Sequence, residues 1–571
     1  MKMTETSRNR GMLDGFNQRA GAQENRFGRM FDLPAAAPAS ETLLRAIANA
    51  MVKTKDLGSP ITVPEVADEN PAIAAGYTYF GQFIDHDITF DPTPLNAAAQ
   101  DEHGRRDFRS AALDLDSVYG RGPADQPYLY DGPCVRVGQP LDSANAVAGT
   151  KHDLLRIRGP KQTPAERPAV PLLGDKRNDE NKIISQLHGL VIAFHNRIAS
   201  TPAIITAAGG DPKDTDSVFT VASRLTRWHY QWVVLHDYIE TVCAPGTLKQ
   251  YIDAAGNVTL PDYLRPQPKY AYMPVEFAVA AFRFGHSMIR PSYALNRFTG
   301  TDTTVKRIPV FSRAPSAQNL NGFPGTVPDT WGIDWGYFLW GLDPQIPTAD
   351  PETPALVPVV FQVPQPSYRI DAFLVDPLHD LPEFRQEAAS NPWVANLAYR
   401  NLLRSQGGAA GSKGLPSGEA VSNALLGHVS VPADKMWGAG SKAYDPAAAD
   451  EDTKNEIAAN ERKRRAVETT AGEEKFPLVG NTPLWYYILR EAEYHGVDKK
   501  NDAADKGRAF GGQHLGPVGS RLVAQTLIGL LHMDGGSILN GDGKAFRPLQ
   551  EVTGGFPMTL STFVFFAANG S

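Results

Sequence analysis

The chain is short of cysteine, of long apolar runs and of excess positive charge, and each shortage excludes a class of protein. Cys134 and Cys243 are the only cysteines among 571 residues, which excludes a disulfide framework. No stretch approaches the roughly 18 consecutive apolar residues of a membrane-spanning helix, so we expect no transmembrane segment. The 63 acidic residues outnumber the 56 basic ones, which argues against a nucleic-acid partner.

The first residues (MKMTETSRNRGMLDGFNQ) also lack the apolar core of a signal peptide. We therefore expect a cytoplasmic protein, or one exported by a non-classical route. Residues 1–60 are expected to form a polar N-terminal arm and one short amphipathic helix at 41–53. Residues 61–571 are expected to form one large catalytic domain, with a charged flap or insert at about 437–476.

Helical periodicity dominates the rest of the chain. The fold class is therefore mainly α, a single large domain with little β structure. The stretch at 343–368 carries seven prolines and is expected to be a surface connection. The helices are predicted at 183–198, 215–242, 274–289, 382–406, 483–496 and 515–533.

Residues 76–92 (GYTYFGQFIDHDITFDP) form the stretch around which the chemistry gathers. On a helix, its apolar face consists of Phe80, Phe83, Ile84 and Ile88. The opposite, polar face consists of Gln82, Asp85, His86 and Thr89. Asp87 lies with the apolar side, and a buried carboxylate needs a counter-charge or a metal. The pattern indicates an imidazole on one side and a cation on the other, although a structural histidine flanked by solvated acids is the simpler interpretation.

A second group of oxygen donors follows at 110–116. Hard divalent cations take six to eight oxygen ligands, which a chain can supply at alternate residues. With Asp87, these donors predict a calcium site beside His86, whereas an acidic turn without metal is the alternative. The donors are the hydroxyl and carbonyl of Ser110, the carbonyl of Ala112, and the carboxylates of Asp114 and Asp116.

Two further segments carry candidate site residues. In GDKRNDEN (174–181), Arg177 and Glu180 share a face of a nascent first turn, although Asn178 or Asp179 can equally be a helix N-cap. In AAFRFGHSMIRP (280–291), His286 lies on a predicted helix beside Gly285, which lets a flat ligand approach the backbone. A neutral imidazole in this setting is a good axial ligand for iron.

Together these segments resemble the animal-type haem peroxidases of the peroxidase–cyclooxygenase superfamily, bacterial-type members included. The resemblance covers about residues 71–530, in the same chain order as in the family. It implies a haem b held between a distal His86 and a proximal His286. It also implies that His86, Arg177 and Gln82 are the catalytic residues, and that Asp85 and Glu180 can form ester links to the haem.

The resemblance assigns roles to other residues as well. Arg283, Asn401 and Arg404 would support the haem, with Asn401 accepting from His286 and Arg404 pairing with a propionate. The loop ahead of VYG (118–120) resembles the family's calcium loop, except that Asp116 stands where the family often has Ser. Asn181 stands where the strongest oxidant of the family has a sulfonium-forming Met, which argues against chloride oxidation.

The implied function is a peroxidase that reduces hydrogen peroxide and, through a ferryl intermediate, oxidises a halide, thiocyanate or a small phenol, with a role in the response to oxidative stress. A monomer or homodimer is expected. The main alternative is a fatty-acid dioxygenase on the same fold, but such enzymes place a radical-forming tyrosine at the position of Arg283. A non-catalytic calcium-binding module and a metallohydrolase using Asp85, His86 and Asp87 are weaker alternatives. His188, His195, His229 and His236 are expected to be structural.

Overall fold

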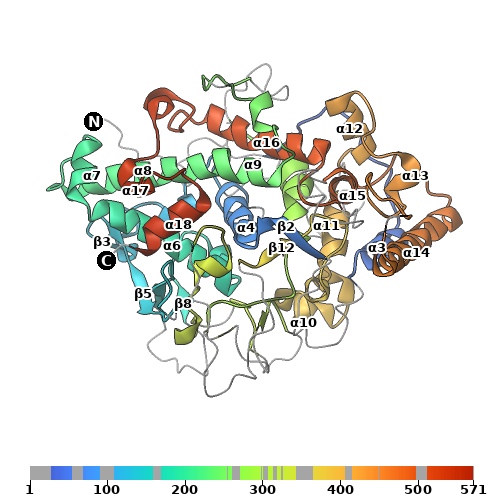
Figure 1. Ribbon diagram of the computed structural model, residues 1–571, viewed down its shortest axis with the longest axis horizontal. Coiled ribbons are helices and arrows are strands. Elements are labelled where there is room, and N and C mark those ends of the chain that lie inside the picture. The colour runs from blue at the N-terminus through green and yellow to red at the C-terminus, as the bar shows by residue number, and fades with distance from the viewer. Residues whose placement is uncertain are drawn as a thin grey trace.

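The computed structural model is mainly helical, as the sequence predicted, and its strands form two-stranded ribbons (Figure 1). It describes residues 27–53, 68–90, 109–143, 145–157, 169–253, 255–259, 271–297, 299, 307–312, 318–322, 326–342, 364–405, 414–447, 449–496 and 511–569. Within these residues, no helix combines the length and the apolar character that crossing a bilayer requires. Residues 1–26 of the expected arm and 343–363 of the proline-rich stretch lie outside the described part.

The α-helices are α3 (Glu41–Ala50), α4 (Gly76–Ile88), α5 (Asp116–Tyr119), α6 (Lys182–Ala199), α7 (Pro202–Ala207), α8 (Thr215–Val233), α9 (Ile239–Val242), α10 (Arg385–Ala388), α11 (Leu397–Ser405), α12 (Gly418–Leu426), α13 (Ala433–Met436), α14 (Glu451–Glu473), α15 (Leu484–His495), α16 (Pro517–Met533), α17 (Gln550–Thr553) and α18 (Leu560–Ala568). Strand β1 (Phe27–Gly28) pairs in parallel with β9 (Met273–Pro274). The antiparallel pairs are β10 (Ser292–Tyr293) with β11 (Ile308–Pro309), β12 (Pro366–Tyr368) with β2 (Glu69–Ala74), β3 (Tyr130–Asp131) with β4 (Cys134–Val135), β5 (Val137–Pro140) with β6 (His152–Leu154), and β7 (Arg156–Ile157) with β8 (Val170–Pro171).

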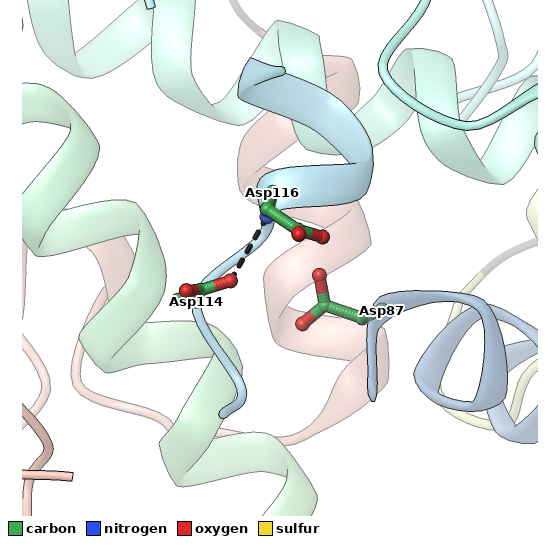
Figure 2. A group of neighbouring side chains, drawn as sticks. All are labelled: Asp87, Asp114 and Asp116. Carbon is green, nitrogen blue, oxygen red and sulfur yellow. Dashed lines mark hydrogen bonds between the residues drawn. The ribbon is translucent and has the colours of Figure 1, made fainter. Parts of the chain in front are cut away.

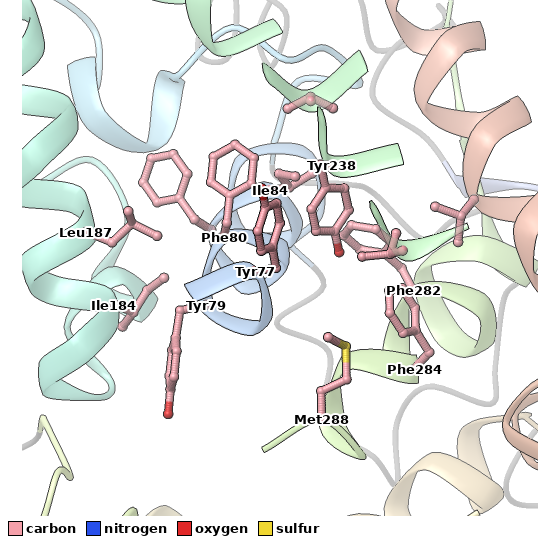
Figure 3. Packing of buried hydrophobic residues seen from close by; sticks show 14 of the residues in the cluster. Tyr77, Tyr79, Phe80, Ile84, Ile184, Leu187, Tyr238, Phe282, Phe284 and Met288 are labelled. Carbon is pink, nitrogen blue, oxygen red and sulfur yellow. The ribbon is translucent and has the colours of Figure 1, made fainter. Parts of the chain in front are cut away.

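Helix α4 lies at the centre of the molecule (Figure 1). It packs against α6 on one side and against the segment that carries His286 on the other. Figure 3 shows its aromatic side chains between Ile184 and Leu187 of α6 and the ring of Phe282. Gly81 allows this packing, because a Cβ there would come within 2.3 Å of the hydroxyl oxygen of Tyr238.

The predicted polar face of α4 is not a solvated surface. Asp85, His86 and Thr89 are all less than a tenth exposed, and Gln82 is the one residue of the helix that is not fully buried. The helix also ends at Ile88, before the predicted Pro92, because Thr89 is extended and its hydroxyl caps the carbonyl of Asp85. Buried polar groups on all sides of a helix require partners from other segments.

The segment predicted as a regular helix at 274–289 is irregular. It consists of a π-helical turn, η8 (Glu276–Ala280), followed by a 3₁₀ turn, η9 (Ala281–His286). At the junction, Ala280 has φ −125° and ψ −69°, outside helical geometry. Such departures inside helices are frequent at functional sites.

Several other sequence predictions change in detail. The helical stretch predicted at 382–406 is broken by Pro392, and only α11 at its end is longer than one turn. Residues 366–368, expected to be on the surface, form the buried strand β12. The charged flap contains the helix α14, which packs its apolar stripe against α3.

Candidate active site

Helix α4 presents His86 to the turn η4 (Lys176–Asp179) that precedes α6. The ring is buried, and its Nδ1 lies 2.8 Å from Oδ1 of Asn178. The other ring nitrogen, Nε2, lies 3.5 Å from Oε1 of Glu180. Two residues of the GDKRNDEN motif therefore contact opposite ends of the imidazole.

Gln82 lies one turn before His86 and joins the same group. Its amide nitrogen donates to Oε1 of Glu180, and its amide oxygen accepts from Nδ2 of Asn181 at 3.1 Å. Asn181 also caps α6, because its Oδ1 accepts from the backbone N–H groups of Ile183 and Ile184. The interpretation of Asn178 or Asp179 as the N-cap of this helix is therefore wrong.

Arg177 lies beside the distal histidine without touching its ring. The guanidinium binds Asp175 at 2.8 Å and donates to the carbonyls of His86 and Thr89, at the last turn of α4. It also stacks over Phe90, 4.7 Å from the ring centre. In this geometry Arg177 holds the end of α4 and contributes positive charge to the site.

Asp85 joins the two sides of the site. Its carboxylate accepts from the hydroxyl of Thr89 and lies 3.4 Å from Nη1 of Arg283, which belongs to η9. Burial alone would raise the pKa of Asp85, but Arg283 and Arg177 outweigh it and hold that pKa below its ordinary value. The carboxylate is therefore ionised at neutral pH.

On the proximal side, Nδ1 of His286 lies 3.0 Å from Nδ2 of Asn401 in α11. The pairing of these residues follows the sequence expectation, but the amide nitrogen rather than the oxygen faces the ring. Burial, helped by Arg283 and Arg404, lowers the pKa of His286 to about 3. Within the described residues Nε2 of His286 has no hydrogen bond, so a neutral nitrogen with a free position faces the interior.

The residues present fit a haem. His286 keeps part of its surface accessible, and its surroundings lower its pKa strongly, so its imidazole is neutral and can be reached by a ligand. A Cβ built on Gly285 would meet nothing within 4 Å, so there is open space beside the proximal turn. Gln82, Glu180 and Arg283 are partly accessible as well, although they lie around the buried α4. Arg404, in the last turn of α11, supplies a cation for a propionate.

The predicted calcium ligands also come together. Figure 2 shows the carboxylates of Asp87, Asp114 and Asp116 facing one another, from the end of α4, the following loop and the start of α5. Their ligand oxygens lie within 4.8 Å of one another. Ser110 donates to Asp114 at 2.9 Å, whereas Ala112 is only half-buried on the same loop.

This cluster carries more negative charge than its neighbours balance. Burial and repulsion by neighbouring carboxylates, Asp534 among them for Asp114, raise the pKa of Asp87 and Asp114, and raise that of Asp116 to about 7. Oδ2 of Asp116 is buried without a hydrogen bond. Buried acids of this kind are either protonated or bound to a cation, so the donor set suits a hard divalent ion.

Four residues that the sequence did not single out connect these parts. Arg109 binds Asp116 at 3.2 Å and Asp175 at 2.7 Å, so it links the acidic cluster to the partner of Arg177. Asn178 also reaches His188, whose Nδ1 lies 2.9 Å from Nδ2 of the amide. For Asp175 and Asn178, the one sequence feature that indicated a role in the site was their position within GDKRNDEN. Nothing local in the sequence distinguished Arg109 or His188.

A second hollow of about 430 Å³ lies at the opposite end of α6, between the β5–β6 hairpin and the end of α18. Its walls include Thr150, His152, Arg197 and Thr201, and none of the site residues described above. Of the remaining histidines, His195 and His229 hydrogen-bond to backbone groups and His236 stacks on Trp232.

Part of the chain is similar to a known family. Residues 107–324 match the family model for animal haem peroxidase. The match includes the acidic loop, Arg177, Glu180 and His286, whereas α4 and α11 lie outside it. Proteins of that family bind haem, and the residues around His286 fit such a group.

Thyroid peroxidase from Homo sapiens is 28% identical over 203 residues, which are 31% of this chain and 19% of the relative. Thyroid peroxidase from Sus scrofa is 26% identical over 194 residues, which are again 31% of this chain and 19% of the relative. The match therefore spans about a fifth of the length of these relatives.

Among solved structures, peroxidase A from Dictyostelium discoideum matches with a TM-score of 0.51 at 13% identity, over 91% of this chain and 89% of that one. The chain therefore shares its overall fold with that peroxidase. The rice fatty acid alpha-dioxygenase matches at a TM-score of 0.47 and 12% identity, over 97% of this chain and 80% of that one.

Proposed function

We propose that the protein is a haem-dependent peroxidase that reduces hydrogen peroxide and oxidises bromide, iodide, thiocyanate or small phenols. One observation carries the proposal. Two histidines, His86 buried and His286 partly accessible, each have an asparagine at Nδ1, and the ion pair of Asp85 and Arg283 joins the two segments that carry them. His286 is placed to ligate iron, and His86 is placed to move protons on the opposite side.

His86 acts as the general acid and base. Because Asn178 presents an oxygen to Nδ1, the ring carries its proton there, and Nε2 is free to accept a proton from hydrogen peroxide. The same nitrogen then returns the proton to the departing oxygen, which leaves as water. When bound, the haem supplies the oxidising power, and the protein supplies ligation, orientation and charge.

Gln82 and the charge of Arg177 complete the distal side. Gln82 reaches Glu180 and Asn181, so its amide is fixed beside the path of the peroxide. Arg177 supports negative charge that develops as the O–O bond breaks, and its bonds to the end of α4 keep His86 in place. Asn181 has no sulfur to form a sulfonium, so chloride is excluded from the proposed donors.

Two further features belong to the proposal. Asp85 and Glu180 are the carboxylates that would hold the haem through ester links. Calcium binds Asp87, Asp114 and Asp116 with Ser110 and the carbonyl of Ala112, and so fixes the end of α4 next to His86. Acid extraction under denaturing conditions tests the esters, because release of all haem unmodified contradicts them.

The decisive experiment is the visible spectrum of purified protein supplied with haemin, followed by peroxide titration with bromide, iodide and guaiacol. The proposal expects a six-coordinate or five-coordinate haem spectrum and peroxide-dependent oxidation of at least one donor. A preparation that stays colourless with haemin refutes it. Turnover of linoleate without added peroxide would instead establish the dioxygenase alternative.

A further inference from the structure

Three side chains form a continuous hydrogen-bonded chain behind the candidate site. Nδ1 of His86 lies 2.8 Å from Oδ1 of Asn178, and Nδ2 of Asn178 lies 2.9 Å from Nδ1 of His188. The three residues come from α4, η4 and α6. Each of them is at most 3% exposed, so water does not compete for these bonds.

The chemistry of an amide determines the direction of this chain. An amide oxygen only accepts, so Nδ1 of His86 must be the donor and carry the proton. The amide nitrogen only donates, so Nδ1 of His188 must be the acceptor, and that ring carries its proton on Nε2. If the amide were turned by 180°, both histidines would adopt the opposite tautomers, and Nε2 of His86 would carry a proton.

In the structure the oxygen of the amide faces His86 and its nitrogen faces His188, so both ends of the amide are occupied. The backbone N–H of Asn178 donates to the carbonyl of Asp175 at 3.0 Å, so the residue is also fixed within η4. His188 packs edge-on against Phe83 of α4, with ring centres 6.2 Å apart. Burial lowers the pKa of His188 to about 3, so this ring stays neutral and keeps its accepting nitrogen at neutral pH.

One group opposes this arrangement. Oε1 of Glu180 lies 3.5 Å from Nε2 of His86 and would favour a proton on that nitrogen. The contact is longer than that to Asn178, and the same oxygen already accepts from the amide of Gln82. Because this contact is long and the side chain of Glu180 is 39% exposed, it favours the opposite tautomer only weakly.

We propose that Asn178, oriented by His188, is a positioning residue that holds His86 in the tautomer with the proton on Nδ1 and the lone pair on Nε2. The consequence for catalysis rests on the proposed function, since only this tautomer lets Nε2 accept the proton of hydrogen peroxide. The tautomer itself is a property of the protein without haem.

Nitrogen-15 NMR of the haem-free protein, labelled in its histidines, tests the proposal directly. The signals of His86 are identified by their loss in His86→Gln. In the wild type we expect His86 to be protonated at Nδ1 and His188 at Nε2, at neutral pH. A wild-type His86 that is protonated at Nε2 overturns the proposal, whatever the variants do.

Variants then show whether Asn178 sets the tautomer of His86 or only stabilises the fold. In Asn178→Ala we expect His86 to lose its single tautomer. Asn178→Asp keeps an acceptor for His86 but cannot donate, so His86 should keep its proton on Nδ1 whereas His188 changes tautomer. If Asn178→Ala leaves the His86 signals unchanged, Asn178 does not position the ring. If that variant fails to fold, Asn178→Asp decides, because a His188 that keeps its proton on Nε2 in this variant would overturn the proposal.

Asn196→Ala is the matched control. Asn196 lies on α6, as His188 does, and its amide is likewise occupied at both ends. Its oxygen accepts from the backbone N–H of Val135 and its nitrogen donates to the carbonyl of Val135, both at 2.8 Å. We expect this variant to be destabilised without any change at His86. A changed His86 tautomer in Asn196→Ala would show that loosening of α6, rather than Asn178, is responsible.

A kinetic measurement on the protein loaded with haem links the tautomer to the reaction. A positioned general base contributes about 10²- to 10⁴-fold, so Asn178→Ala should slow the reaction with peroxide at least about tenfold, and Asn178→Asp should recover most of the loss. A protein that binds no haem refutes the proposed function but leaves the NMR result intact. A normal haem spectrum with the wrong tautomer refutes only the role of Asn178.

Discussion

Each of the two site histidines has an asparagine at Nδ1, but the two asparagines present opposite ends of their amides. Asn178 faces His86 with its oxygen, and Asn401 faces His286 with its nitrogen. His188 occupies the other end of the Asn178 amide, whereas no second hydrogen bond to the Asn401 side chain is seen in the described residues. The distal amide is therefore held at both ends, whereas the proximal amide is held at one end.

This difference has a chemical meaning. A histidine that ligates iron through Nε2 needs its proton on Nδ1, so the oxygen of Asn401 must face the ring when haem is bound. The distal histidine already has the arrangement that it needs. We infer that the distal side is preorganised in the protein alone, and that the proximal side completes its hydrogen bond when the cofactor binds. The predictions below are ways to break or sharpen this contrast.

The largest effect is expected from removal of the proximal ring. His286→Ala should lose the axial ligand, so haemin should bind weakly or with an altered absorption spectrum. Circular dichroism should remain that of a helical protein. His236→Ala is the control and should keep the wild-type spectrum. It removes a histidine that packs against Trp232 and that lies far in sequence from His286. A wild-type spectrum in His286→Ala would remove this residue from the account.

Removal of the distal ring should have a different result. His86→Ala should retain haem, because the ring is not the proposed ligand. Stopped-flow measurement of the reaction with peroxide should give a rate constant lower by about 10²- to 10⁴-fold, the usual contribution of a general base. A rate near that of the wild type would exclude the proton-transfer role, and loss of haem would mean that the two sides are not distinct.

The proximal amide should have a smaller effect. Asn401→Leu removes the partner of Nδ1 at similar size, and such changes behind a metal ligand commonly cost about 10- to 100-fold in affinity or activity. Haem titration measures the affinity, and the spectrum reports on ligand basicity. Asn401→Asp, a stronger acceptor, should restore affinity. If both variants bind haem as the wild type does, the contact with His286 is incidental.

Calcium should stabilise the distal side alone. At a concentration of 100 times its Kd, a ligand of the folded state adds about 2.7 kcal/mol to the free energy of unfolding. We expect addition of Ca²⁺ to raise Tm in the wild type but not in Asp114→Asn, and chelation to slow the peroxide reaction without changing proximal ligation. An unchanged Tm after chelation would argue against calcium at this cluster.

The smallest predicted effect concerns acid stability. The pKa of His188 is about 3 in the folded protein against 6.5 ordinarily, so the folded state binds the proton less well. This contribution to stability is complete above pH 6.5 and is lost as pH falls toward 3. In His188→Gln, the free energy of unfolding should fall less steeply with decreasing pH, by at most about 1.4 kcal/mol per pH unit. Chemical denaturation at several pH values measures this slope. If the wild type and His188→Gln lose stability equally steeply with decreasing pH, His188 is not held neutral.

Several features could be predicted from the sequence because their signals are local. The apolar stripe of α4 and the helical periods of α6, α8, α15 and α16 follow from spacing alone. The alternation of oxygen donors from Ser110 to Asp116 indicated a cluster with Asp87, and these carboxylates do meet. The irregular turns around His286 could not be predicted, because the residues of 274–289 have ordinary helical periodicity and tertiary contacts impose the π and 3₁₀ geometry.

The sequence by itself therefore determined which residues are proposed to carry the chemistry, since the order and spacing of His86, Arg177, Glu180 and His286 are properties of the chain. Only the tertiary structure decided what each of them touches. Arg177 faces Asp175 and the end of α4, and Asn178 lies between two imidazoles, because α4, η4 and α6 bury these groups together. A buried polar group must find its partner among whatever the fold brings near, and that partner is distant in sequence.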